Sequence, residues 1–247
     1  MRPGPCTATR RETGGFRLDF LPSGKLGALT LPSGAALLRR AEQSFDLGGG
    51  RRFAPGGWDE CFPTIEPWNG FPAMGELVWR VPVIRERGGR VEQVWEAPGF
   101  VAARSFRPRS GRELEVTFRV RNRSGQPLEF LWASHAVFAL DGLSAVTLPD
   151  GRLLDEFSLD GSCSKFFVRS GRAVRLRRPE GEVRLRTDQP WWGIWLNRGG
   201  WPAPSPAGLG GLGIEATNCP ADRPQGTALR AGGSFRGTVI VEDRGDR

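Results

Sequence analysis

Glycine and proline interrupt this chain at short intervals, and this feature limits its possible folds most strongly. The 247 residues include 35 glycines and 20 prolines. Between these turn-forming residues lie short runs in which apolar and polar side chains alternate, as in residues 113–120 (Glu-Leu-Glu-Val-Thr-Phe-Arg-Val). Strict alternation is the period of a half-buried β-strand, and almost no segment has the period of a helix. The sequence therefore predicts an all-β protein.

Two pairs of these runs are joined by short turns and predict β-hairpins. The first hairpin joins residues 77–84 to residues 90–96, and the second joins residues 173–177 to residues 182–186. Residues 35–43 fit a short helix as well as a strand. Further strand-like runs are residues 16–20, 27–31, 35–38, 127–140, 191–197 and 234–242.

About a dozen short strands with frequent turns indicate a β-sandwich or a barrel. No change of composition divides the chain, so we expect one domain over residues 1–247, with an ordered core at about 15–242 and a surface loop at 203–213. That loop contains Gly-x-Gly-x-x-Gly at 208–213. A dinucleotide site needs a helix directly after this motif, and the residues that follow do not begin one. We therefore expect no dinucleotide cofactor.

Neither a membrane span nor a cysteine-based site is predicted. No stretch approaches the roughly 20 apolar residues that a transmembrane helix needs. The first residues lack the apolar segment of an export signal, so we expect a cytoplasmic protein. The four cysteines (Cys6, Cys61, Cys163 and Cys219) form no Cys-x-x-Cys pair, which predicts free thiols and no metal site.

The chain is basic, with a formal net charge of +8. Only two of its 35 basic residues are lysines, Lys25 and Lys165, and the arginines are scattered singly and in pairs. A nucleic-acid surface would gather them on one stripe or patch. We therefore expect no nucleic-acid partner, and salt-dependent retention on DNA or RNA would contradict this.

His135 is the only histidine in the chain. Its side chain is the one whose ordinary pKa lies near neutrality, so it is the natural proton carrier if this protein is an acid–base enzyme. The alternative is a structural histidine within a strand. No Gly-x-Ser-x-Gly segment is present, so a serine hydrolase is not indicated.

Several carboxylates stand close to tryptophans in the sequence. Asp59 and Glu60 follow Trp58, and Glu76 precedes Trp79. Nine tryptophans with no tyrosine, mixed with carboxylates, suit a concave site for a polyhydroxylated ligand. The alternative is that the indoles fill the core and that the carboxylates pair with arginines.

Three segments of the sequence carry a resemblance to a known family. They are residues 134–140 (Ser-His-Ala-Val-Phe-Ala-Leu), residues 213–222 (Gly-Ile-Glu-Ala-Thr-Asn-Cys-Pro-Ala-Asp), and residues 57–65 (Gly-Trp-Asp-Glu-Cys-Phe-Pro-Thr-Ile) with 72–79 (Pro-Ala-Met-Gly-Glu-Leu-Val-Trp). In this order they resemble segments of the galactose mutarotase-like superfamily, which includes the aldose 1-epimerases. The resemblance covers about residues 15–242.

The resemblance implies a large twisted β-sandwich, or supersandwich, and a mechanism. Glu215 would take the proton from the anomeric hydroxyl of a sugar, and His135 would donate a proton to the ring oxygen. Neither step needs a cofactor or a metal ion. Candidate contacts to the sugar are the hydroxyl-binding side chains and two stacking indoles: Glu60, Glu76, Arg104, Asn197, Trp79 and Trp195.

Two departures from the family pattern leave alternatives open. Met74 stands where family members carry a second active-site histidine. The substrate-orienting aspartate has no clear counterpart, although Asn197 or Asp188 could serve. We expect an enzyme that interconverts the anomers of a free sugar or sugar derivative, with a non-catalytic carbohydrate-binding protein as the alternative. The sequence indicates neither which sugar is bound, nor whether it is phosphorylated, nor the oligomeric state.

Overall fold

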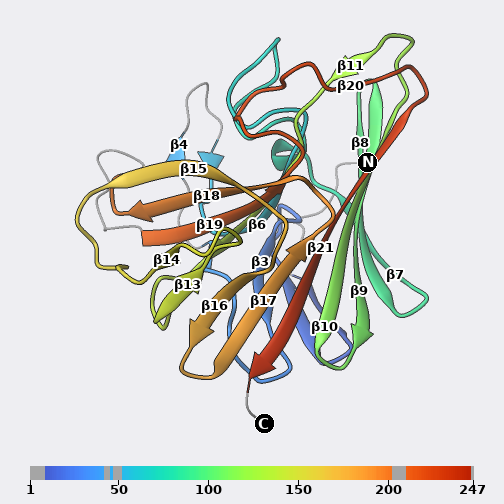
Figure 1. The fold of residues 1–247 in the computed structure, drawn as a ribbon. Coiled ribbons are helices and arrows are strands. Elements are labelled where there is room, and N and C mark those ends of the chain that lie inside the picture. The colour runs from blue at the N-terminus through green and yellow to red at the C-terminus, as the bar shows by residue number, and fades with distance from the viewer. Residues whose placement is uncertain (1–8, 42–44, 47–51, 202–209, 246–247) are drawn as a thin grey trace.

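The computed structural model describes residues 9–41, 45–46, 52–201 and 210–245. Within these residues the chain forms β-strands and one short 3-10 helix, η1 (Leu77–Trp79), so the all-β prediction is confirmed (Figure 1). Every strand pair is antiparallel, as expected for runs joined by short turns. No helix among the described residues is long and apolar enough to cross a membrane.

Two large sheets make up the molecule. The eight-stranded sheet has the order β1 (Thr9–Thr13), β2 (Phe16–Phe20), β3 (Leu26–Thr30), β6 (Gly57–Cys61), β12 (Ala133–Phe138), β19 (Gly210–Thr217), β18 (Trp191–Arg198), β15 (Cys163–Arg169). The nine-stranded sheet has the order β14 (Leu153–Leu154), β13 (Ala145–Thr147), β16 (Val174–Arg178), β17 (Gly181–Thr187), β21 (Ser234–Gly245), β10 (Glu113–Asn122), β9 (Phe100–Ser110), β8 (Arg90–Ala97), β7 (Val83–Arg87). Two small ribbons pair β11 (Leu128–Glu129) with β20 (Ala228–Leu229) and β4 (Phe45–Asp46) with β5 (Arg52–Phe53).

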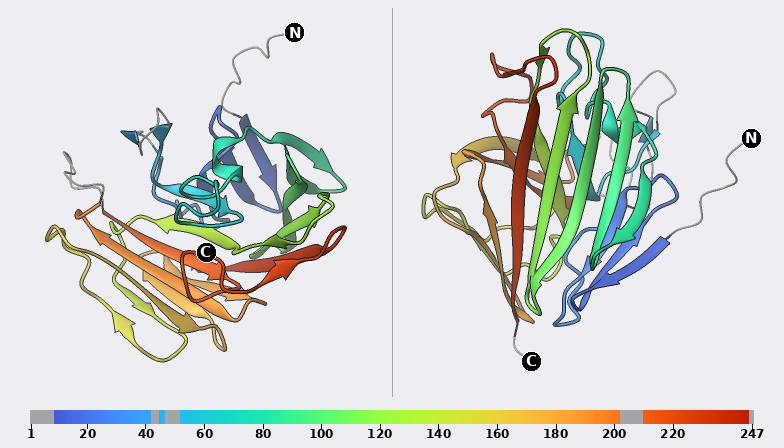
Figure 2. Two further views of the ribbon diagram at one scale, coloured as in Figure 1. Left: turned by 90° about the horizontal axis from the view of Figure 1, so that it is seen from above. Right: turned by 90° about the vertical axis from the view of Figure 1, so that its right-hand side faces the viewer.

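The hydrophobic core lies between the two large sheets, which makes the fold a β-sandwich. In the second half of β10, Phe118 and Val120 are buried, whereas Arg119 and Arg121 are exposed. This is the alternation that burying one face of a strand requires. Figure 2 shows the long strands β21, β10, β9 and β8 side by side in a twisted layer, as the sandwich prediction implies.

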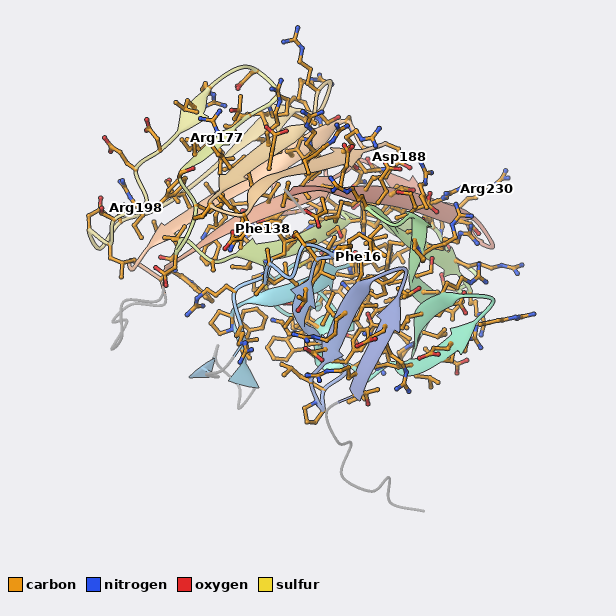
Figure 3. All side chains as sticks on the ribbon, turned by 90° about the horizontal axis from the view of Figure 1, so that it is seen from below. Phe16, Phe138, Arg177, Asp188, Arg198 and Arg230 are labelled. Carbon is orange, nitrogen blue, oxygen red and sulfur yellow. The ribbon has the colours of Figure 1, made fainter. Side chains whose placement is uncertain are left out.

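Large aromatic side chains fill the space between the layers. The Phe62 and Phe100 ring centroids lie 4.9 Å apart, and the Phe118 and Trp132 rings stack at 5.5 Å. Phe16 and Phe138 also lie inside, while Arg177 and Arg230 extend from the periphery (Figure 3). Some of the tryptophans, such as Trp132, therefore fill the core, which is one of the two alternatives that the sequence left open.

Both predicted hairpins are present, as β7–β8 and β16–β17. The first strand of the β7–β8 hairpin is Val83–Arg87 and not residues 77–84, because residues 77–79 form η1 and residues 80–82 are not in a strand. Residues 35–41 form neither a helix nor a regular strand, because Ala36 and Leu38 make only isolated bridges. Residues 42 and 43, the last two of the segment predicted as a short helix or a strand, lie outside the described part of the chain.

The ordered part of the chain is longer than expected. β1 lies before residue 15, and β21 continues past residue 242 to Gly245. Residues 210–213 belong to β19 and not to a surface loop, while residues 203–209 of that prediction lie outside the described residues. Cys61, Cys163 and Cys219 are free thiols, as expected, and Cys6 lies outside the described residues.

Candidate functional site

Strand register brings the two predicted catalytic residues together. His135 in β12 is directly opposite Glu215 in β19, and on the other side of β12 it is opposite Asp59 in β6. Directly opposed residues of antiparallel strands project from the same face of a sheet. The row continues from Glu215 through Gly193 of β18 to Phe167 of β15. Five strands therefore contribute one residue each to a single row on this face.

The neighbouring row on this face adds an aromatic ring and a cation. It contains Val137, Gly213, Trp195 and Lys165. These rows border a cavity of about 370 Å³, a volume that suits a small ligand. The residues that line it are Phe53, Pro55, Gly56, Ile65, Glu66, Met74, His135, Val137, Cys163, Ser164, Lys165, Trp195, Trp201, Glu215 and Asp222.

Glu215 is the centre of a charged cluster on the cavity wall. The side chain is fully buried, His135 Nε2 lies 3.3 Å from its Oε1, and Lys165 Nζ donates a hydrogen bond to its Oε2 over 2.8 Å. Among the described residues, Glu215 Oε1 has no hydrogen-bond partner. Buried polar atoms normally have one, so Glu215 Oε1 lacks the partner that a buried carboxylate oxygen usually has.

The pKa values of the pair follow from burial and from neighbouring charges. Burial alone would raise the pKa of Glu215, but Lys165 and His135 outweigh it, and the pKa lies below its ordinary value. Burial lowers the pKa of His135, more than the nearby Glu215 carboxylate raises it. At neutral pH the site therefore holds an ionised carboxylate beside a neutral imidazole.

Lys165 connects Glu215 to a second carboxylate. Its Nζ lies 2.6 Å from Asp222 Oδ1, in the segment that follows β19. No sequence motif indicated a role for Lys165. The sequence feature that could have drawn attention to Lys165 is its rarity, because the chain has only two lysines. The other lysine, Lys25, also makes a buried ion pair at this sheet, with its Nζ 2.6 Å from Asp59 Oδ2.

Aromatic rings form another part of the cavity wall. Trp195 was a predicted stacking residue, and its ring centroid lies 6.0 Å from that of His135. Trp201 meets Trp195 edge to face at 5.6 Å, and Phe53 lies 6.4 Å from Trp201. Trp201 and Phe53 were missed, because nothing in their local sequence distinguishes them from core aromatics.

Met74 lines the cavity from the loop before η1. Its backbone has a positive φ of 63°, which is unusual for a residue other than glycine, and its N–H donates to Ile65 O over 2.6 Å. Met74, which the resemblance aligns with the family's second histidine, thus faces the cavity. It brings an apolar thioether where a histidine would bring a titratable ring.

Glu60 and Arg104, two predicted hydroxyl contacts, lie in the core instead of at the cavity. Glu60 follows Asp59 in β6, so its side chain projects from the opposite face of the sheet. Arg104 Nη1 lies 3.2 Å from Glu60 Oε1, and Trp132 Nε1 donates to Glu60 Oε2 over 2.7 Å. Burial raises the pKa of Glu60 to about 7 despite these partners.

The other predicted contacts do not line the cavity. Asn197 Nδ2 donates to Trp201 O over 2.6 Å, and Asn197 Oδ1 accepts from Trp201 N, so this side chain fixes the turn that carries Trp201. Trp79 packs near Phe53, with ring centroids 6.3 Å apart. Glu76 pairs with Arg80 at 2.5 Å.

Asp188, considered as the substrate-orienting acid, is placed elsewhere. Its Oδ1 accepts a hydrogen bond from Thr238 N over 2.8 Å, beside strand β21. It therefore belongs to the nine-stranded sheet region and not to the cavity lining. Asp222 is the carboxylate that the structure brings to the cavity in addition to Glu215 and Glu66.

No protein-family model and no curated protein matches this sequence. Solved structures do match along almost the whole chain. A candidate aldose 1-epimerase from Escherichia coli K12 superposes with a TM-score of 0.68 at 15% identity, covering 96% of this chain and 98% of that one. A galactose mutarotase-like protein from Lactobacillus casei gives a TM-score of 0.65 at 15% identity over 95% and 99% of the two chains.

A galactose mutarotase related enzyme from Lactobacillus acidophilus gives a TM-score of 0.67 at 14% identity, over 96% of this chain and 98% of that one. Identities this low show a shared fold and leave activity open. The fold is that of the galactose mutarotase-like proteins, as the resemblance in three sequence segments implied.

Proposed function

We propose that this chain, which has the galactose mutarotase-like fold, interconverts the α and β anomers of an aldose or aldose derivative in the cavity around Glu215. The observation that carries the proposal is the buried, ionised Glu215 beside His135 in a cavity with indole walls. Such a group is a base that is ready at neutral pH. We expect the protein to act on a small sugar in the cytoplasm.

The reaction begins at the anomeric hydroxyl. Glu215 Oε1, which has no hydrogen-bond partner among the described residues, takes the hydroxyl proton. The C1–O5 bond breaks, its electron pair goes to the ring oxygen, and that oxygen receives a proton from an acid in the cavity. The resemblance gives this acid role to His135. The C1–C2 bond then rotates, and the reverse transfers close the ring on the other face.

The walls of the cavity suit the other parts of a sugar. Trp195 and Trp201 offer flat apolar faces for the C–H side of a pyranose ring, while Asp222 and Glu66 offer acceptors for its hydroxyls. Because both chemical steps are proton transfers, these side chains need only bind and orient the substrate.

The test is the rate at which a freshly dissolved anomer reaches equilibrium, followed by polarimetry. We expect the wild type to accelerate this change for at least one aldose and Glu215→Gln to abolish the acceleration. Glu86→Gln is the matched control, because Glu86 is an exposed glutamate of β7 in the nine-stranded sheet, where it pairs with Arg11 at 2.9 Å. It should retain most of the activity. Equal rates in the wild type and Glu215→Gln would refute the proposal.

A second function is favoured by one observation. Met74, which the resemblance aligns with the family's second active-site histidine, lines the cavity. The chain would then bind a carbohydrate without transforming it. Calorimetry separates the two functions, since sugar binding with no acceleration of anomer exchange supports the binding protein.

A further inference from the structure

The nine-stranded sheet carries a second hollow, separate from the cavity around Glu215. It has a volume of about 360 Å³ and lies over β9, β10 and β21, which run side by side in Figure 2. Phe118 of β10 packs in the core, so the next residue, Arg119, projects from the opposite face of this sheet. The hollow and the cavity share no lining residue. We call it the outer hollow.

Three arginines that are far apart or alternate in the sequence meet at the outer hollow. Arg119 of β10 is directly opposite Arg236 of β21, and Arg121 follows two positions after Arg119 on the same face. Directly opposed residues have Cβ atoms about 4.5–5.5 Å apart, and residues two positions apart along a strand are separated by about 7 Å. All three arginines are exposed and line the outer hollow. Their guanidinium groups can therefore reach one small area.

Short side chains form the rest of this surface. On the other side of β10, Ala103 of β9 is opposite Arg119, and Val101 is opposite Arg121. Ser234 of β21 is also opposite Arg121, and it adds a hydroxyl group to the lining. These residues are too short to fill the space beside the arginines, which is why the sheet is hollowed here.

The protein does not balance the positive charge of the outer hollow. Among the described residues, none of its three arginines makes an ion pair, and no carboxylate lines it. Further along the same face, Glu115 of β10 pairs with both Arg107 and Arg109. Like charges directly opposite each other destabilise a sheet. The opposed pair Arg119 and Arg236 therefore has a cost that an anionic ligand would remove.

We propose that the outer hollow binds the phosphoryl group of a small phosphorylated molecule. A phosphate monoester carries a charge of about −1.5 to −2 at pH 7 and has three acceptor oxygens, so it matches three guanidinium groups better than a carboxylate does. Arginine suits phosphate because its planar N–H groups can donate two parallel hydrogen bonds. The volume is in the range of small-molecule pockets. This binding site is independent of the proposed anomer interconversion.

A nucleic-acid strand matches this surface less well. It needs a positive groove that follows several successive phosphates. Beyond the outer hollow, the outward arginines of β9, β17 and β21 pair with carboxylates, for example Arg186 with Glu113 and Arg244 with Glu242. The unbalanced charge of these strands is thus confined to one small site.

The experiment titrates inorganic pyrophosphate into the full chain at constant ionic strength and follows binding by calorimetry. We expect saturable binding by the wild type. The dissociation constant should rise about tenfold or more in Arg119→Met/Arg236→Met, because hydrogen bonds between charged groups are lost. Arg175→Met/Arg177→Met is the matched control, since it removes two exposed arginines from β16 of the same sheet. It should bind within about twofold of the wild type.

Thermal unfolding without pyrophosphate establishes that each variant is folded, and Arg119→Met/Arg236→Met should be at least as stable as the wild type. A folded wild type that does not bind pyrophosphate would overturn the inference. Equal weakening in the two double variants would also overturn it, because it would show a general effect of charge. A ten-nucleotide single strand that binds more tightly than pyrophosphate, and is released in Arg119→Met/Arg236→Met, would assign the surface to nucleic acid.

The same variants separate this inference from the proposed function. Glu215→Gln should bind pyrophosphate as the wild type does, because Glu215 does not line the outer hollow. Arg119→Met/Arg236→Met should leave anomer exchange unchanged, because neither arginine lines the cavity. Failure of anomer exchange in the wild type would refute the proposed function and leave the pyrophosphate result standing.

Discussion

Glu215 shows how a few neighbours determine the chemistry of one buried side chain. It has no exposed surface, a condition that by itself favours the protonated carboxyl. Lys165 and His135 reverse that preference and lower its pKa. The same carboxylate without Lys165 would stay protonated up to a higher pH. The cluster therefore combines a structural ion pair with a reactive group.

His135 should make the stability of the fold depend on pH. Its pKa in the folded protein lies below the ordinary 6.5 because of burial. As the pH falls below 6.5, the unfolded chain binds a proton before the folded chain does, so folding stability decreases. We expect the free energy of unfolding in urea to fall more steeply between pH 7.5 and 5.5 in the wild type than in His135→Gln. Glu60 titrates in both proteins, so the difference isolates His135, and parallel slopes would contradict it.

At the scale of elements, β18 leaves space for the Glu215 carboxylate by placing a glycine beside it. A Cβ on Gly193 would lie 3.1 Å from Glu215 Oε2 and 3.2 Å from Phe167 Cε1. Both distances are tighter than ordinary van der Waals contact. The small residue at this position of the strand is therefore part of the site, although it carries no chemistry.

Gly193→Ala should displace the Glu215 carboxylate and lower kcat by about tenfold or more, because small shifts of reacting groups have large effects on rate. Thermal unfolding should show that the fold persists. Gly171→Ala is the matched control, since a Cβ there meets no atom within 4 Å. Full activity in Gly193→Ala would show that the position of Glu215 is not restricted by β18.

The core ion pair between Glu60 and Arg104 joins the two sheets. Arg104 in β9 reaches Glu60 and Trp58 O in β6, and its Nε donates to Gln93 Oε1 over 2.8 Å. Removing one partner of such a pair leaves a buried group without its counter-charge, which typically costs about 3–5 kcal/mol. The alternation of side chains along β6 turns Glu60 toward the core and away from the cavity, and Arg104 of β9 pairs with it there.

Arg104→Met should therefore lower the free energy of unfolding by about 3–5 kcal/mol in a urea titration. Arg177→Met, at an exposed arginine of β16, should change it by about 0.5 kcal/mol or less. Sugar affinity per folded molecule should not change in either variant. A stable Arg104→Met protein with specifically weakened sugar binding would restore the hydroxyl-contact role expected from the sequence.

At the scale of the whole molecule, local patterns predicted the strands but not their neighbours. The Gly88-Gly89 turn and the alternation of residues 113–120 were enough to identify β7, β8 and β10. The sequence did not show which side chains of β6 point toward the cavity, because two adjacent carboxylates, Asp59 and Glu60, lie in the same five-residue strand. Only strand pairing shows which one lies on the cavity side.

The site could be predicted only in part for the same reason. His135 and Glu215 were identified through family-like segments, and β12–β19 pairing places them directly opposite each other. Lys165 lies 50 residues before Glu215 in a segment with no recognisable motif. Its partner is set by the strand order β19-β18-β15, which no local pattern reveals. The pairing of strands that are distant in the sequence therefore determines which side chains meet at the site, and local motifs identify only some of them.

The most direct test of the account is saturation-transfer NMR of anomer exchange at equilibrium, over a panel of neutral aldoses and hexose 6-phosphates. The account predicts that the wild type accelerates exchange between the α and β signals of at least one sugar. It also predicts that Glu215→Gln, folded by circular dichroism, returns that exchange to the uncatalysed rate. Acceleration that persists in Glu215→Gln, or none for any sugar with a folded wild type, would contradict the claim that this cavity performs anomeric proton transfer.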